Sequence, residues 1–120
     1  MHANEVIPMR YLLLLWGDEA AEQAMSEAER VAMIEAHRAF SAGLRERGRA
    51  VSGDAIQPSA TAVVVRPDGS VSDGPFAETK EQLGGYYVVE CADRADAIDI
   101  ARAVPASPGL RVEVRELAGL

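Results

Sequence analysis

The chain has 120 residues, which is the size of one domain. Hydrophobic residues make up 48% of it and charged residues 26%, a globular balance that excludes a disordered chain. Its formal net charge of −7 argues against nucleic acid and anionic membranes as partners, because an acidic surface repels both.

Residues 1–8 are expected to form an extension in front of a single domain at 9–120. The extension lacks a basic segment followed by a long apolar one, so no signal peptide is predicted. The apolar run YLLLLW at 11–16 is far shorter than the roughly 20 residues of a membrane span. These features predict a cytoplasmic protein without a membrane partner.

The first half of the domain begins with a strand at 11–16, an unbroken apolar run that ends at Gly17. The next stretch, GDEAAEQAM, is expected to be a loop. Ser26 with Glu29 three residues later forms a capping-box pattern, which predicts a helix start. That helix is expected to run to Arg47 and stop at Gly48.

The second half is predicted to contain mostly strands. RAVSGDAI and ATAVVVR are expected strands, PDG at 67–69 is a turn, and a short extended piece leads to Asp73. GYYVVEC is the next strand, and Asp93 caps a second helix that Pro105 helps to end. The alternating segment LRVEVREL is the last strand.

This order predicts an α+β, ferredoxin-like βαββαβ domain with an extra hairpin, in which both helices cover one face of an antiparallel sheet. The strands at 11–16, 60–66 and 85–91 are apolar on both faces, so the second face needs a cover as well. The simplest cover is the same face of a second copy related by a two-fold axis. The sequence therefore predicts a homodimer that packs sheet on sheet.

His37 is the first candidate for chemistry. The spacing of Met33, His37, Phe40 and Leu44 places this histidine inside the apolar stripe of the long helix, facing the sheet. A core histidine with one hydrogen-bond partner would explain this position. The alternative is a general acid or base held in a dry cleft, with its pKa tuned by burial.

The second candidate is the polar connection at 73–85, DGPFAETKEQLGG. Its turn residues include Asp73, which can form an Asx turn, and AETKEQLGG is predicted to be a turn or two of helix stopped by the glycines. The displayed residues Glu78, Thr79 and Lys80 fit a solvated face. The functional alternative is a loop that closes over the helix–sheet cleft and brings these side chains to His37.

A histidine beside a carboxylate makes a workable acid/base pair, and Asp73 or Asp54 could supply the carboxylate. Asp54, at a strand end, is better explained as a turn residue. No ligand-pair spacing for a metal appears, and no nucleotide or hydrolase motif is present, so neither a metal nor a cofactor is expected. Cys91 is the only cysteine and is expected to be a buried, inert thiol.

The segment DGPFAETKEQLGGYYVVE at 73–90 closely resembles the signature of the DGPF branch of the YCII-related proteins. Further segments from RYLLLLWGDE to DAIDIARAVPASPGLRVEVRE extend the resemblance over nearly the whole chain from Met9. It implies a dimeric α+β barrel of ferredoxin-like halves. Relatives include enzymes acting on small cyclic compounds, with a proposed histidine–aspartate pair whose histidine corresponds to His37. Their Asp-Pro after the second helix is Val104-Pro105 here, so Asp73 would have to substitute.

The first functional hypothesis is a cofactor-independent lyase or isomerase using acid/base chemistry on a small, cyclic, oxygenated metabolite. His37 would move the proton, Asp73 would orient it, and Lys80, with Glu78 and Thr79, would bind the substrate. The alternative is a non-catalytic small-molecule-binding or regulatory module associated with sigma-factor transcription systems. The sequence leaves open whether the protein is an enzyme.

Overall fold

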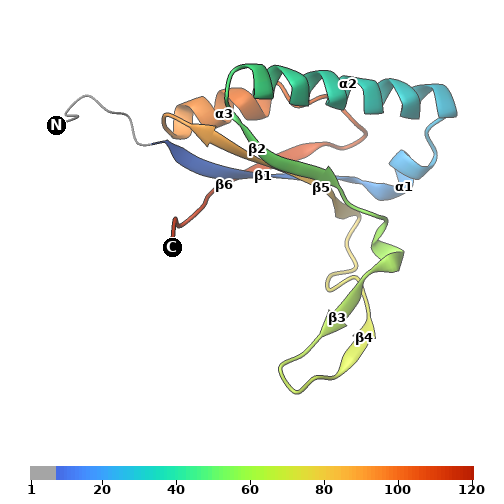
Figure 1. Cartoon of the computed structure of the whole chain (residues 1–120). Helices are drawn as coiled ribbons and strands as arrows, with labels where there is room; N and C mark the ends of the chain where they lie inside the picture. Colours follow the sequence, from blue (N-terminus) through green and yellow to red (C-terminus); the bar gives the residue numbers. More distant parts are fainter. Residues whose placement is uncertain (1–7) are drawn as a thin grey trace.

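The computed structural model describes residues 8–120 as one four-stranded sheet, a separate two-stranded arm and three α-helices (Figure 1). The expected extension at 1–8 lies outside the described residues except for Pro8. In chain order the elements are β1 (Met9–Asp18), α1 (Glu19–Gln23), α2 (Glu27–Glu46), β2 (Ala50–Ala55), the 3-10 turn η1 (Ser59–Thr61), β3 (Val63–Val65), β4 (Val71–Asp73), β5 (Glu81–Cys91), α3 (Arg94–Arg102) and β6 (Arg111–Glu116). None of these helices is long and apolar enough to span a membrane.

The main sheet has the strand order β2-β5-β1-β6, and every neighbouring pair is antiparallel. Helices α2 and α3 lie together over one face of this sheet (Figure 1). This is the ferredoxin-like arrangement with both helices on the same side, so the predicted fold class is confirmed.

The core lies between this helical layer and the sheet. In β1, Tyr11, Leu13 and Leu15 alternate with less buried residues, as expected for a strand with one face on the core. Leu13 and Val89 are fully buried and meet Leu44 of α2 in the same cluster. The remaining buried members are Cys91, Ala97, Ile100 and Val104.

The ends of both long helices follow the predicted signals. The Ser26 side chain accepts a hydrogen bond from the Glu29 backbone N–H, and the Glu29 carboxylate accepts one from Ser26 N–H. Helix α2 ends at the cap residue Arg47, and Gly48 follows with a φ of +68°, a conformation that glycine tolerates best. Asp93 caps α3 by accepting from the Asp96 backbone N–H at 2.9 Å.

Two local predictions were wrong. Residues Glu19–Gln23 form the short helix α1 where a loop was expected, because Asp18 accepts a hydrogen bond from Ala21 N–H and caps it. The predicted helix at 77–85 is absent: β5 begins at Glu81, and Gly84 and Gly85 lie within that strand. Pairing with β1 overrides the local helical pattern, and the register shift between Leu15 and Trp16 accommodates the glycines in an irregularity of the ladder.

The strand expected at 60–66 is shorter and belongs to an arm, defined here as β3, β4 and their turn. Val63–Val65 pairs only with Val71–Asp73, outside the main sheet. The arm projects from the side of the sheet opposite α2 (Figure 1). Val63, Val65 and Val71 are each more than 60% exposed, an unusual state for apolar strand residues.

The sheet face opposite α2 and α3, called here the open face, carries apolar side chains. Strand alternation places Leu12, Leu14 and Trp16 of β1 there, beside Tyr86 and Val88 of β5. No helix covers this face in Figure 1. Trp16 Nε1 donates a hydrogen bond to Glu113 of β6 at 3.0 Å, so the face is apolar at its centre with a polar contact toward the β6 edge.

Cys91 ends β5 as a free thiol that is only 2% exposed, so the predicted buried cysteine is confirmed. Burial, with a further contribution from the nearby Asp96 carboxylate, raises the pKa of this thiol. A raised pKa keeps the sulfur protonated and unreactive.

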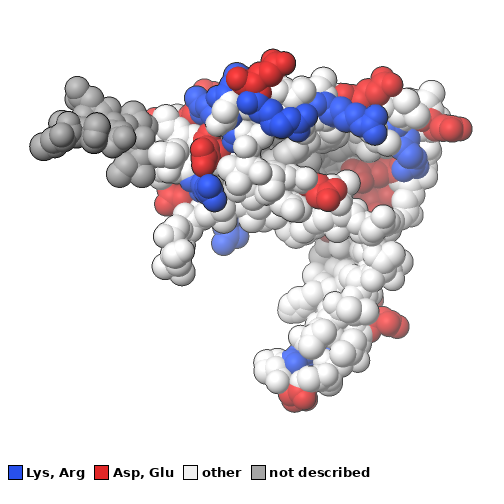
Figure 2. Space-filling model, viewed as in Figure 1, with Lys and Arg blue, Asp and Glu red and all other residues white. Residues whose placement is uncertain are grey.

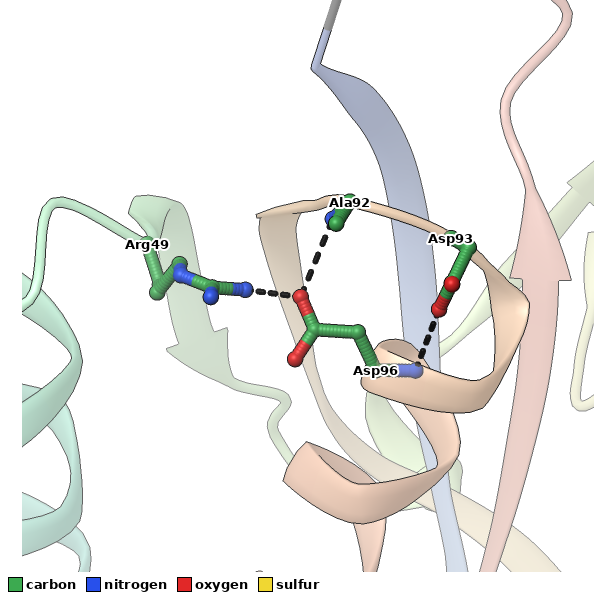
Figure 3. A network of polar contacts seen from close by, with 4 residues as sticks. All are labelled: Arg49, Ala92, Asp93 and Asp96. Atoms are coloured by element: carbon green, nitrogen blue, oxygen red, sulfur yellow. Dashed lines mark hydrogen bonds and ion pairs between the residues drawn. The ribbon is translucent and has the colours of Figure 1, made fainter. Parts of the chain in front are cut away.

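Asp96 links the start of α3 to Arg49, which directly precedes β2 (Figure 3). Its Oδ2 accepts from Ala92 N–H at 3.0 Å and from the Arg49 guanidinium. The Ala92 N–H, followed by Arg49, holds the pKa of Asp96 below its ordinary value of 3.8. The stabilisation by the carboxylate is therefore fully present above pH 3.8 and is lost as pH falls through the lowered pKa.

Replacing Asp96 with asparagine should lower the free energy of unfolding at pH 7 by about 1 kcal/mol, because a charge-assisted pair of contacts becomes neutral. Urea denaturation between pH 7 and pH 3 measures this, and the difference should shrink toward the acid end. Asp99→Asn is the matched control on the same helix, since its pair with Arg102 is exposed and contributes little. Equal effects of the two substitutions would contradict the prediction.

Candidate active site

A cavity of about 460 Å³ lies between α2 and the β5 side of the sheet. This volume is within the range of small-molecule sites. Figure 2 shows the molecule hollowed beneath α2. The lining combines one stripe of α2 with the floor formed by β2 and β5, and it closes at one end with residues from α1 and the loop before β6.

His37 lies on the α2 wall and is half-buried. Its Nδ1 and the Tyr87 hydroxyl share a hydrogen bond of 2.7 Å, in which the donor depends on the tautomer of the ring. The two rings are stacked at 6.0 Å between centroids, with 17° between their planes. Phe40 packs edge-on against Tyr87 at 5.1 Å. The histidine ring is thus held in one orientation by β5 and by its own helix.

Burial lowers the pKa of His37 below its ordinary value of 6.5, because an apolar wall disfavours the imidazolium. At pH 7 the ring is neutral and has a nitrogen available to take a proton. This is the protonation state that a general base requires.

Glycines make the floor of the cavity shallow. Gly53, Gly84 and Gly85 all line it. A Cβ on Gly53 would lie 2.6 Å from Cδ1 of Tyr87, and one on Gly85 would lie 3.1 Å from the Asp54 carbonyl oxygen. The absence of side chains at these positions leaves room for Tyr87 and for the cavity itself.

Glu22 is a carboxyl group of this cavity that the sequence analysis missed. It comes from α1, and its Oε2 would lie 3.8 Å from a Cβ on Gly84. Burial raises the pKa of Glu22, reinforced by the neighbouring Glu19 and Asp18 charges and opposed by a hydrogen bond from Ser107. Only a prediction of α1 from the Asp18 cap signal would have placed Glu22 beside the sheet.

Within one copy, the structure does not bring the predicted loop residues to His37. Asp73 pairs with Val63 in the arm, and it does not line the cavity. Lys80 forms an ion pair with Asp18 at 3.4 Å, and Thr79 Oγ1 donates to the Glu81 carbonyl at 2.6 Å. Glu78 is exposed.

Asp54 does line the cavity, and its Oδ1 accepts a hydrogen bond from Ala55 N–H at 2.8 Å. Asp54 lies within strand β2 and pairs with Tyr86, so the turn position preferred for it was wrong. Among residues 8–120, no group of three His, Cys, Asp or Glu side chains is arranged to hold a metal ion.

Tyr87 is the second functional residue that the sequence analysis did not single out. Strand alternation was the available signal: Val89 and Cys91 share its side of β5, and that side faces the helices. Neither the alternation nor the GYYVVEC pattern reveals that the hydroxyl meets His37, because that contact depends on how α2 crosses the sheet.

The ferredoxin-like fold and a helix–sheet cavity with a histidine–tyrosine contact define a small α+β domain with a candidate small-molecule site. The YCII-related domain family matches residues 9–118, so the chain belongs to this family, as its sequence resemblance indicated. The chain is also similar to the uncharacterized protein R00369 of Rhizobium meliloti (strain 1021), with 36% identity over 115 residues. That alignment covers 92% of this chain and 93% of the relative.

Proposed function

We propose that the cavity is the active site of a cofactor-independent enzyme of the lyase or isomerase type, acting on a small, cyclic, oxygen-bearing organic molecule. The observation that carries this proposal is the hydrogen bond between His37 and Tyr87 at the wall of a cavity of suitable size. A neutral, oriented histidine in a partly dry site is suited to take a proton from a carbon next to a carbonyl group.

In the proposed reaction His37 is the acid/base residue. When Nδ1 carries the ring hydrogen and donates it to the Tyr87 oxygen, Nε2 is free to accept a proton from the substrate. The electron pair of the broken C–H bond moves toward the carbonyl oxygen, and the imidazolium then returns the proton to a second carbon or to a leaving oxygen. The first outcome is an isomerisation and the second is an elimination of water.

The roles predicted for Asp73, Lys80, Glu78 and Thr79 depend on a second copy. The arm that carries Asp73 projects away from α2 of its own chain (Figure 1), so Asp73 would meet a His37 only from a partner's arm. The acid/base role of His37 does not require this contact.

Replacing His37 with glutamine should reduce proton transfer by about 10²- to 10⁴-fold, the usual contribution of a positioned acid/base group. The measurement is deuterium incorporation from D₂O, followed by proton NMR, into a panel of small cyclic β-hydroxy and β-oxo carbonyl compounds. His2→Gln is the control that removes the other histidine. Exchange that survives in the His37 variant, or no exchange with any compound, would contradict the enzyme proposal.

The exposed arm supports a second candidate, a non-catalytic small-molecule-binding or regulatory module that docks on a transcription partner. Phe76 is 84% exposed and follows an arm whose valines are also exposed. Such side chains are suited to contact with another protein. Under this candidate His37 would be a structural residue, and its replacement would alter stability without removing an activity.

We further propose a homodimer that packs open face on open face. Leu12, Leu14 and Trp16 lie on that face, and the two helices leave it uncovered. Sheet-on-sheet packing would bury these side chains against their own copies, an isologous contact of the kind that two-fold dimers use.

At micromolar concentration, size-exclusion chromatography with light scattering should give the mass of two chains. Leu14→Arg, at the centre of the open face, should weaken association by about 30-fold or more, as for a buried interface hot spot. Val31→Arg is the control on the helical side, where Val31 is already 47% exposed. A monomeric wild-type protein would contradict the proposal.

A further inference from the structure

The α2 wall of the cavity carries positive charge in a protein that is acidic overall. Arg38 and Arg45 both line the cavity, with Ser41 between them. The two arginines are two helical turns apart, about 10.5 Å along the axis, so they share one face of α2. In Figure 2, blue side chains, which on α2 are all arginines, border the hollow along this helix. The chain as a whole has a net charge of −7.

Within residues 8–120 these two arginines form no ion pair with a carboxylate. The ion pairs found among residues 8–120 use arginines 10, 49, 102 and 115 and Lys80. Glu22 brings a carboxyl group to the cavity from α1, and it forms no ion pair with Arg38 or Arg45 in the described part of the chain. The cavity therefore has a positive wall on α2 and a carboxyl group at its α1 end.

The part of the cavity between the arginines of α2 and the carboxyl group at the α1 end is largely apolar. Leu15, Met33 and Leu110 line it together with Tyr87. A ligand that matches all three features has an apolar or aromatic body and one negatively charged end. A guanidinium binds a carboxylate through parallel hydrogen bonds, and the Ser41 hydroxyl can add a third donor.

We propose that the ligand of this cavity is a small organic monoanion, a carboxylate attached to a ring or short apolar body, whose charged group is held by Arg38 and Arg45. The inference rests on the proposed function in that it names the substrate class of the same site. The carboxylate end lies on the arginine side of α2, and the rest of the molecule extends toward His37 and Tyr87. A second negative charge is disfavoured by Glu22.

Benzoate and benzamide are the probes, because they share a shape and differ in charge. Isothermal titration calorimetry at pH 7 and low salt should show benzoate binding with a Kd on the order of 1 mM. Benzamide should bind at least tenfold more weakly, and 0.5 M NaCl should weaken benzoate binding, because salt screens the charge of the arginines. Benzamide binding as tightly as benzoate, or no benzoate binding at all, would overturn the proposal.

Arg38→Gln and Arg45→Gln should each weaken benzoate binding by about tenfold, since each removes a charge-assisted hydrogen bond. Arg66→Gln removes the same charge from the arm, away from the cavity lining, and should leave the Kd unchanged within about twofold. Equal effects of all three substitutions would mean that only the overall charge matters, and would overturn the site.

His37→Gln separates this proposal from the proposed function. The variant should lose deuterium exchange, whereas its preference for benzoate over benzamide should remain, because that preference depends on Arg38 and Arg45. Benzoate binding that depends on Arg38 and Arg45 while deuterium exchange is absent would support the anion site and reject the enzyme. Deuterium exchange that depends on His37, without a preference for benzoate over benzamide, would support the enzyme and reject the anion site.

Discussion

Replacing Leu13 with alanine should lower the free energy of unfolding by about 3 kcal/mol, the usual cost of a large-to-small change at a rigid core position. Leu13 is fully buried in the central strand β1, and it pairs with Tyr87 of β5 and Val114 of β6. Both neighbours are fixed by the sheet, so little collapse can refill the space that the side chain leaves.

Urea denaturation followed by circular dichroism measures this loss. Val63→Ala is the control, because it makes a comparable aliphatic deletion in the arm, where the side chain is 61% exposed. Its effect should stay within about 0.5 kcal/mol. A Leu13 variant as stable as the Val63 variant would show that the core is not centred on β1.

Replacing Gly53 with valine should disturb the site and the stability together. The new Cβ would lie 2.6 Å from Cδ1 of Tyr87 and 3.0 Å from the Tyr86 carbonyl oxygen. The Tyr87 ring can turn only by giving up its 2.7 Å hydrogen bond with His37, and the backbone oxygen cannot turn away at all. Overpacking of this kind costs about 1–3 kcal/mol.

Two measurements check this prediction: urea denaturation, and NMR of the His37 ring, whose signals should shift when the contact with Tyr87 is lost. Gly43→Ala is the control, since nothing lies within 4 Å of a Cβ there and Gly43 is within α2. Alanine at that position should stabilise the protein by about 0.5–1 kcal/mol. Unchanged His37 signals and unchanged stability in the Gly53 variant would contradict the prediction.

The sequence predicted the parts of the fold that local chemistry decides. Ser26 with Glu29 marks the start of α2 by a mutual hydrogen bond, and Gly48 marks its end by a backbone conformation. Both signals act within a few residues, so they can be read without knowing the tertiary structure. The YCII-related family was also recognisable from the segment at 73–90.

The wrong predictions concern segments whose secondary structure is decided by pairing with residues distant in the sequence. Residues 77–85 have a helical pattern, but Glu81 onward pairs with β1 and becomes strand β5. The energy of joining a sheet exceeds the small helix preferences of single residues. Residues 63–65, by contrast, form with 71–73 the extra hairpin that the element order predicted, outside the main sheet.

The candidate site was predicted in part. The helical spacing around His37 placed it toward the sheet, where the structure has it against Tyr87. The partners were not predictable, because Tyr87 and Glu22 reach the cavity from β5 and α1, distant in sequence from His37. The polar residues at 73–80 suggested a ligand-binding loop. In the structure they instead make local contacts within the connection, such as the hydrogen bond from Thr79 to the Glu81 carbonyl.

The buried sulfur at the end of β5 has a kinetic consequence. Thiol reagents attack the thiolate, and Cys91 is shielded from solvent and has a raised pKa in the folded chain. Labelling must therefore wait for the end of the sheet formed by Met9 and Cys91 to separate. Because the chain has one cysteine, the labelling rate reports how often this end opens under native conditions, without denaturant or an introduced cysteine.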